Sequence, residues 1–186
     1  MTRRTPRLLA VDGVHGGAVK NAARALVAAN RAKRAGVSLW GASGIFDELD
    51  MAGPEVAKAS ARTLLLLYAT DLAFRLRWEI RPALAEGRLV IAAPYLDTAV
   101  AFGLAAGLDA AWLRNLFLFA PRPAMRRLVD SPAAKTRKLQ AGFVEFGWRH
   151  VSAISPALTR QGLLGQTRVH LRHLASRHAA RMRVAR

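Results

Sequence analysis

A cluster of glycines follows a short apolar segment near the start of the chain. Residues 8–12 are apolar up to an aspartate, and an Ala-rich helical pattern begins at residue 18. A glycine loop between a strand and a helix can bind phosphate groups, because free backbone N–H groups and the positive end of the helix dipole meet there. The alternative is an ordinary tight turn. The candidate phosphate-loop residues are Gly13, Gly16, Gly17, Lys20 and Asn21.

The loop departs from the Walker-type phosphate loop, whose pattern is G-x-x-x-x-G-K-[ST]. Counting from Gly13, the second glycine is replaced by Ala18, the lysine by Val19 and the hydroxyl residue by Lys20. If the loop is one residue longer, Lys20 takes the lysine position and Asn21 takes the hydroxyl position, where its neutral carbonyl would bind magnesium weakly. Without that extra residue, Lys20 is rotated by about 100° and points away from the phosphates.

Composition and charge limit the class of protein. At 186 residues the chain has the size of one domain, 1–186, and it contains no cysteine, which is typical of a reducing cytoplasm. Its apolar runs are shorter than the ~20 residues that span a bilayer, so we expect no membrane segment. Residues 121–186 carry 14 basic and two acidic side chains out of 29 and 12 in the whole chain. This basic C-terminal third predicts an anionic partner, or alternatively an arginine-rich solvated face.

Alternating strand and helix patterns predict an α/β protein with a parallel sheet of about five strands flanked by helices in three layers. Strands are predicted at residues 8–12, 37–40, 89–93 and 116–120, with a candidate fifth at 151–154. Helices are predicted at 18–34, 54–85, 96–106, 124–129, 133–148 and 163–183. In the last of these, His170 and His173 are three residues apart, but without a carboxylate nearby we interpret them as part of a basic amphipathic helix.

The topology also predicts where a pocket lies. Ligands of open parallel sheets bind beyond the carboxyl ends of the strands. The residues expected around that pocket are Asp12, Gly13, Trp40, Gly41, Pro94, Tyr95, Ala120 and Pro121. Asp71 is the one acid in the apolar middle of the long predicted helix, so it is either paired with an arginine or lines a polar pocket.

Two segments resemble the thymidylate kinase family. Residues 80–91, IRPALAEGRLVI, followed by Tyr95, Asp97 and Thr98, are similar to that family's R-P-A-L-x-x-G-x-x-V-I-x-D-R-Y-x-x-S. Residues 66–71, LLYATD, resemble its L-L-F-A-A-D-R, and the glycine loop lies at the expected start. The resemblance covers residues 7 to 130 in the order of the family.

The resemblance implies a P-loop NTPase-like fold, with ATP at the glycine loop and dTMP between the long helix and the third strand. Gly13 and Gly16 match loop glycines, and Tyr68 takes the place of the phenylalanine that stacks on thymine. The nucleoside-pocket residues implied in this way are Tyr68, Asp71, Tyr95, Asp97 and Thr98. Homodimers packed through the long central helix are frequent in the family, so the same homodimer is expected here by analogy.

The departures from the family affect its charged groups. Ala93 and Pro94 replace the aspartate–arginine pair after the third strand, and Leu72 replaces the arginine that grips the acceptor phosphate. The family's R-E-P-G-G segment is LWGAS at residues 39–43. Phosphoryl transfer relies on such cations, and one arginine finger alone contributes ~10³ to 10⁵ in rate.

Three interpretations of these departures stay open. The leading one is a pseudoenzyme that keeps the fold and binds a nucleotide or a partner. The second is an active ATP-dependent dTMP kinase, in which Lys20 serves the phosphates and Asp12 or Asp97 organises Mg²⁺ with ATP. The third is a nucleic-acid-binding or assembly module that uses the basic C-terminal third.

Overall fold

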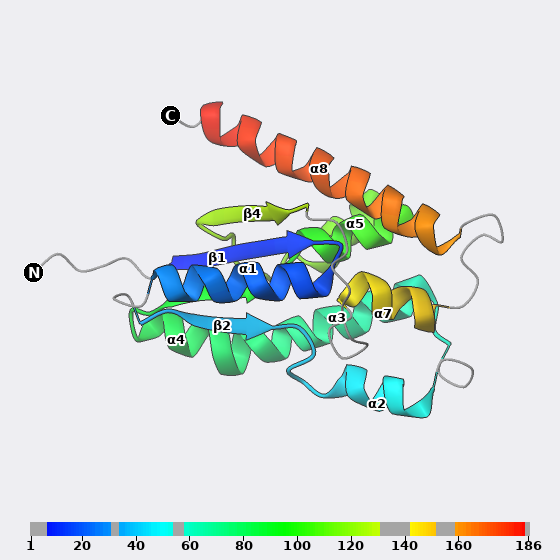
Figure 1. The fold of residues 1–186 in the computed structure, drawn as a ribbon, viewed down its shortest axis with the longest axis horizontal. Coiled ribbons are helices and arrows are strands. Elements are labelled where there is room, and N and C mark those ends of the chain that lie inside the picture. Colours follow the sequence, from blue (N-terminus) through cyan, green and yellow to red (C-terminus); the bar gives the residue numbers. More distant parts are fainter. Residues whose placement is uncertain (1–6, 31–33, 54–57, 131–141, 152–158, 185–186) are drawn as a thin grey trace, which may run out of the picture.

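The computed structural model describes residues 7–30, 34–53, 58–130, 142–151 and 159–184. Strands and helices follow one another along the chain (Figure 1). The first half contains β1 (Arg7–Gly13), α1 (Gly16–Ala29), β2 (Gly36–Leu39), α2 (Ile45–Ala52), α3 (Ala61–Arg75), the π-helical segment η2 (Leu76–Ile80) and α4 (Arg81–Ala85). The second half contains β3 (Leu89–Ala93), α5 (Asp97–Ala105), α6 (Ala110–Leu116), β4 (Met125–Val129), α7 (Phe143–His150) and α8 (Arg160–Val184).

The four described strands form one parallel sheet in the order β2-β3-β1-β4. Ala10 of β1 lies opposite Ala92 of β3 on one side and opposite Arg126 of β4 on the other. β1 is buried from its second residue onward and β3 is buried throughout, as is typical of central parallel strands covered on both faces. The predicted α/β fold with a parallel sheet is therefore confirmed, with four strands in the described part of the chain.

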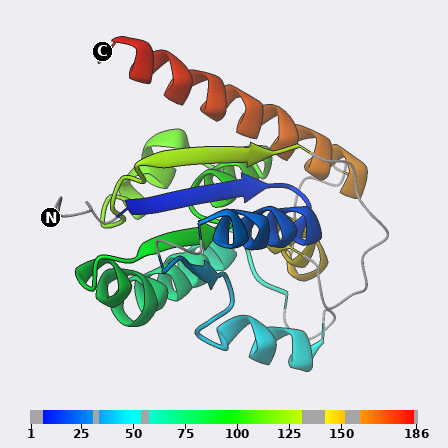
Figure 2. The same cartoon turned by 60° about the vertical axis from the view of Figure 1, so that its left-hand side comes forward.

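Helices cover both faces of this sheet. α1 packs on one face, where Val19 and Ala23 contact side chains of β1 and β3. The other face carries the larger apolar core, to which α3, α5, α7 and α8 contribute residues such as Leu65, Phe102 and Phe143. α8 runs beside β4 at one edge of the sheet, and α2 lies at the opposite side of the molecule (Figures 1 and 2). No described helix has the length and apolar content needed to cross a bilayer.

The helix predicted over residues 54–85 is described from residue 58 and is helical from Ala61, through α3, η2 and α4. Ser60 caps its start by accepting a hydrogen bond from the Thr63 N–H at 3.0 Å. Leu66, Phe74 and Trp78 are exposed on its outer side. The homodimer through this helix stays a prediction.

The fourth strand is the main error of the sequence-based prediction. Residues 116–120 are not a strand, because Leu116 is the last residue of α6 and residues 117–120 form the turn after it. The N-cap of α6, Asp109, accepts a hydrogen bond from the Trp112 N–H. The strand is β4, where a helix was predicted over 124–129. Its sequence MRRLV mixes charged and apolar residues, and pairing with β1 overrides the helical pattern. Ala120 and Pro121 consequently precede the amino end of β4 and not its carboxyl end.

Two further predictions lie partly outside the described residues. Of the candidate fifth strand at 151–154 only Val151 is described, and it forms an isolated bridge with Ala59. Of the helix predicted at 133–148, the described part is α7. α2 is an addition, since no element is predicted between the loop at residues 41–44 and residue 54.

Gly103 of α5 should be one of the positions least tolerant of a side chain. A Cβ there would lie 2.6 Å from Leu113 Cδ2 and 2.8 Å from Leu65 Cδ1, both on fully buried leucines. We expect Gly103→Ala to lower the free energy of unfolding by about 1–3 kcal/mol through overpacking. Gly165→Ala in α8 is the matched control, since its Cβ meets nothing within 4 Å and a helical Gly→Ala change normally stabilises by up to about 1 kcal/mol.

Urea unfolding of the two variants measures both effects. Equal stabilities for Gly103→Ala and Gly165→Ala would contradict the close packing of α5 between α3 and α6.

Candidate functional site

The glycine loop is shorter than a Walker-type loop. β1 ends at Gly13 and α1 begins at Gly16, so only Val14 and His15 separate the strand from the helix. His15 takes the N-cap position with extended backbone angles and makes no capping hydrogen bond through its side chain. Lys20 is then the fifth residue of α1, beyond the first turn in which a phosphate-binding lysine is expected. That Lys20 serves the phosphates through a lengthened loop stays a prediction.

The chain's own backbone lies against the N-terminus of α1. A Cβ added at Gly142, just before α7, would lie 2.6 Å from Gly16 Cα and 2.7 Å from Gly16 N. On the same loop, the His15 ring nitrogen Nε2 lies 2.9 Å from Arg168 Nη2 of α8. Burial and this arginine lower the pKa of His15. The backbone just before α7 thus lies against one side of Gly16, which also lines the cleft described next.

Lys20 lines a cleft of about 330 Å³ beside the carboxyl ends of β2 and β3. The same cleft contains Asp47, Asp50 and Arg149, so its acidic and basic side chains are equal in number. Asp50 lies 2.9 Å from Arg149 Nη1 and 3.0 Å from His150 Nε2, and the hydrogen bond to His150 is the main reason that the pKa of Asp50 is lowered. Aromatic rings from Trp40, Phe46 and Phe146 also line this cleft. A balanced, partly aromatic lining differs from the cationic surroundings that phosphoryl transfer needs.

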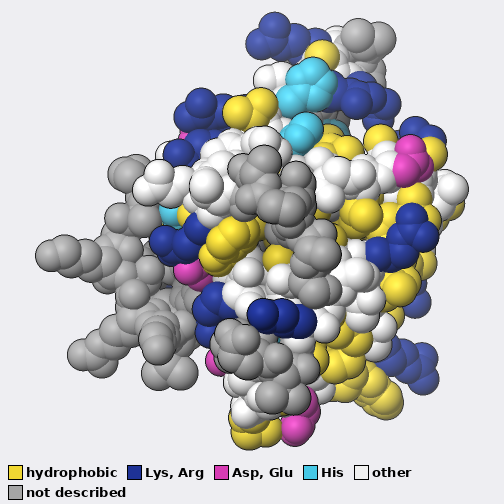
Figure 3. Space-filling view, turned by 90° about the vertical axis from the view of Figure 1, so that its right-hand side faces the viewer, with side chains coloured by type: hydrophobic (Ala, Val, Ile, Leu, Met, Phe, Trp, Pro, Cys, Tyr) yellow, Lys and Arg dark blue, Asp and Glu magenta, His cyan; other side chains and the backbone are white. Residues whose placement is uncertain are grey.

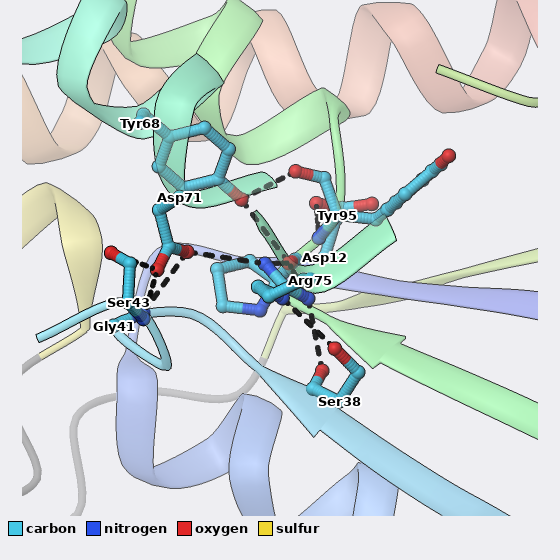
Figure 4. A network of polar contacts seen from close by, with 9 residues as sticks. Asp12, Ser38, Gly41, Ser43, Tyr68, Asp71, Arg75 and Tyr95 are labelled. Carbon is cyan, nitrogen blue, oxygen red and sulfur yellow. Dashed lines mark hydrogen bonds and ion pairs between the residues drawn. The ribbon is translucent and has the colours of Figure 1, made fainter. Parts of the chain in front are cut away.

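Asp71 and Arg75 form the centre of a buried polar network (Figure 4). Asp71 accepts hydrogen bonds from the N–H groups of Gly41 and Ser43 and from the Ser43 hydroxyl, at 2.9 to 3.1 Å. Arg75 follows one helical turn later, and its Nη1 lies 3.8 Å from Asp71 Oδ2. Both side chains have 0% exposure. The prediction that Asp71 is paired with an arginine or lines a polar pocket is resolved in favour of the arginine.

Each nitrogen of the Arg75 guanidinium donates a hydrogen bond within the protein. Its Nε donates to the Ser38 hydroxyl at 3.0 Å, and its Nη2 donates to the Ser38 carbonyl at 2.9 Å. Both Nη atoms donate to the Pro94 carbonyl at 3.2 Å. All three nitrogens therefore have partners at the ends of β2 and β3, and none is left for a phosphate. Arg75 is not among the site residues predicted from the sequence, where its signal is the four-residue spacing from Asp71.

Tyr68 and Tyr95 also tie the strand ends to the helices. The Tyr68 hydroxyl donates to the Pro94 carbonyl and its ring centroid lies 4.5 Å from that of Phe143. The Tyr95 hydroxyl donates to the Pro121 carbonyl at 2.8 Å. Burial raises the pKa of both phenols. Because neither residue has exposed area, the Tyr68 ring is not free to stack on a base in this structure.

Asp12 has one satisfied and one unsatisfied carboxylate oxygen. Its Oδ1 accepts hydrogen bonds from the Tyr95 N–H, the Thr98 N–H and the Thr98 hydroxyl at 2.9 to 3.0 Å. The Thr98 oxygen in turn accepts from the Gly13 N–H at 3.1 Å. Oδ2 is buried and has no partner among the described residues. Burial and the nearby Asp97 raise the pKa of Asp12 to about 6.

The predicted site residues consequently do not converge on one space. Lys20 and Gly16 face the cleft beside β2 and β3, whereas Asp12 and Asp97 line a different cleft between β4 and α8. Asp97 is paired with Arg126 at 2.9 Å and lies 3.3 Å from His178. Gly17 is buried and Asn21 is exposed.

The donor set does not fit Mg²⁺ with ATP. The free oxygen of Asp12 and the Lys20 amine line different clefts, and no hydroxyl residue begins α1. The described residues also contain no cluster of three or more His, Asp or Glu side chains that could hold a metal ion, which leaves His170 and His173 without further ligands.

Comparisons with known proteins identify similar chains. No protein-family profile matches. A probable thymidylate kinase of Pyrococcus horikoshii is 38% identical over 93 residues, which are 48% of this chain and 45% of that protein. A thymidylate kinase of Clavibacter sepedonicus is 39% identical over 90 residues, 46% of this chain and 43% of that one. Thus the matched part spans less than half the length of these curated relatives.

A solved structure resembles the whole fold. The thymidylate kinase of Ehrlichia chaffeensis superposes with a TM-score of 0.62 over 94% of this chain and 86% of the other, at 14% sequence identity. At that identity the match shows the fold alone. Together these findings confirm the resemblance to the thymidylate kinase family that the two sequence segments indicate.

Replacing Arg75 should destabilise the fold more than most single changes. Arg75→Met leaves Asp71 and two backbone carbonyls buried without their cation, and we expect a loss of about 3 kcal/mol in the free energy of unfolding. The exposed Arg77 is the matched control, and Arg77→Met should change stability by no more than about 0.5 kcal/mol. Denaturant unfolding of both variants measures these changes. Equal losses of stability in Arg75→Met and Arg77→Met would contradict a stabilising role of the buried Arg75 network.

Asp12 should make stability depend on pH. Because its pKa is raised from 3.8 to about 6, the folded protein holds this proton more tightly than the unfolded chain. The resulting stabilisation is complete below about pH 4 and is lost as pH rises through 6, at about 1.4 kcal/mol per pH unit and about 3 kcal/mol in total. Asp12→Asn keeps an oxygen for the three hydrogen bonds and has no titrating proton.

Unfolding free energies of the native protein and Asp12→Asn, measured from pH 4 to pH 7, test this. Relative to the variant, the native protein should lose stability over that range. Parallel pH profiles would show that Asp12 is not the buried, proton-retaining carboxyl that the structure indicates.

Proposed function

We propose that this chain is a thymidylate-kinase-like protein that no longer transfers phosphoryl groups and acts by binding. The observation that supports the proposal is the close approach of Gly142 to Gly16, which puts protein backbone beside the end of α1, at the loop where the family resemblance implies ATP. The curated relatives are named thymidylate kinases, so ATP and dTMP are the nucleotides to test.

The state of the charged groups supports the same proposal. Leu72, which is fully buried, stands where the family has the arginine that binds the acceptor phosphate. The nearby Arg75 donates hydrogen bonds to backbone carbonyls. After β3 the chain has Ala93 and Pro94 in place of an aspartate and an arginine. Each cation lost from a phosphoryl-transfer site removes several kcal/mol of transition-state stabilisation, so these changes together are sufficient to abolish useful turnover.

Two alternatives rest on specific observations. An active dTMP kinase is favoured by Lys20 and Gly16, which line the same cleft. A nucleic-acid-binding module is favoured by α8, which contains six arginines and no acid. Figure 3 shows Lys and Arg side chains spread over the face beyond the carboxyl ends of the strands, with apolar patches between them.

The decisive experiment is a phosphoryl-transfer assay with labelled ATP, Mg²⁺ and dTMP. We expect the native protein to form no more dTDP than Lys20→Ala does, because neither brings a cation to the phosphates. Both proteins must have the same circular dichroism spectrum for the comparison to count.

Magnesium-dependent formation of dTDP that Lys20→Ala abolishes would refute the proposal and establish the active kinase. If there is no transfer but an oligonucleotide binds with an affinity that falls steeply with salt, the binding partner is a nucleic acid, and Arg177→Ala in α8 should reduce the salt dependence.

A further inference from the structure

A second cleft, of about 540 Å³, lies between β4 and α8. It shares no lining residue with the cleft that contains Lys20. β4 is the edge strand of the described sheet, and α8 runs alongside it (Figures 1 and 2). On the helix side the lining includes two small residues, Ala175 and Ala179, beside Leu171, His178 and Arg181. Its volume is within the range of small-molecule sites in proteins.

The floor of this cleft carries an unsatisfied acceptor. Asp12 lines the cleft, is 3% exposed, and is fixed through its Oδ1 by Tyr95 and Thr98. Its Oδ2 has no hydrogen-bond partner among the described residues. A buried polar atom without a partner is costly, and a ligand that donates a hydrogen bond to it removes that cost.

The rim of the cleft is positively charged. Arg126 is neutralised by Asp97 at 2.9 Å. The other arginines of the lining, Arg122, Arg127 and Arg181, are exposed and form no ion pair with a described residue. The apolar residues of the lining include Met125, Leu128 and Leu171. The lining of the cleft therefore combines exposed arginines, apolar side chains and, in Asp12 Oδ2, one buried acceptor without a partner among the described residues.

We propose that the β4–α8 cleft is a binding site for a small organic anion, whose anionic group lies at Arg122 and Arg181 and whose N–H or O–H group donates to Asp12 Oδ2. The apolar body of the ligand lies between Leu128 and Leu171. This site does not depend on the proposed loss of phosphoryl transfer, because it uses neither Lys20 nor the glycine loop.

The probe is the isomer of anilinonaphthalene sulfonate whose amine and sulfonate are at opposite ends of the naphthalene. It is an apolar anion with one N–H donor, and its fluorescence increases when it leaves water. We expect one site per chain. Naphthalene sulfonate, which lacks the amine, should compete for the same site with lower affinity.

Variants separate the parts of the site. Asp12→Asn places an amide N–H where Oδ2 was, so the anilino probe should bind about tenfold or more weakly, while naphthalene sulfonate is unaffected. The double change Arg122→Ala and Arg181→Ala should weaken both molecules by about tenfold. Ala179→Trp, at an exposed position of the helix wall, should fill the cleft and abolish both.

Two matched controls should bind as the native protein does. Arg177→Ala removes an exposed arginine of α8 that does not line the cleft, and Lys20→Ala alters the other cleft. The proposal is overturned if neither molecule binds, if binding survives Ala179→Trp, or if Lys20→Ala abolishes it. Loss of probe binding in Asp12→Asn supports the proposal only if the variant keeps the circular dichroism spectrum of the native protein. Ala179→Trp changes an exposed residue, so it tests the site without altering the core.

Discussion

The buried pair of Asp71 and Arg75 fixes the part of the molecule on which the site depends. A guanidinium can be buried only when its donors are satisfied, and here the acceptors are the backbone carbonyls of Ser38 and Pro94, at the ends of two adjacent strands. Asp71 in turn holds the turn after β2 through Gly41 and Ser43. α3 thus determines where β2 and β3 end. The cost of breaking one member of this pair keeps the arrangement in place.

This constraint explains how a thymidylate-kinase-like fold coexists with a dispersed set of catalytic groups. The cation nearest the implied acceptor site stabilises the fold and cannot bind a phosphate at the same time. The Gly16 end of α1 is in close contact with Gly142. Lys20 shares its cleft with two aspartates and an arginine. The apolar residues of the sheet and its covering helices determine the fold independently of the chemistry.

The sequence allowed prediction of those elements whose pattern is set locally. β1 and β3 are short apolar runs bounded by charge or glycine. Both ends of α5 and α8, and the start of α1, were predicted to within a few residues. The end of α1 was predicted at residue 34, but the helix ends at Ala29. β4 was missed because MRRLV has no strand-like alternation, and only its pairing with β1 makes it a strand. In the site, the Asp71–Arg75 pair was foreseeable from a one-turn spacing. Gly142 and Gly16 are far apart in the chain, and no local sequence pattern indicates that they are in contact. This contact could therefore not be predicted from the sequence.

The most direct measurement of the central claim uses the protein labelled with ¹⁵N in glycine and follows the amide signals of Gly13, Gly16 and Gly17 during titration with ATP and Mg²⁺. If α7 covers the end of α1, these three signals stay at their positions at millimolar nucleotide. A saturating shift of Gly16 and Gly17 that inorganic triphosphate reproduces would show that the loop opens and binds phosphate, which would contradict a helix end closed by Gly142.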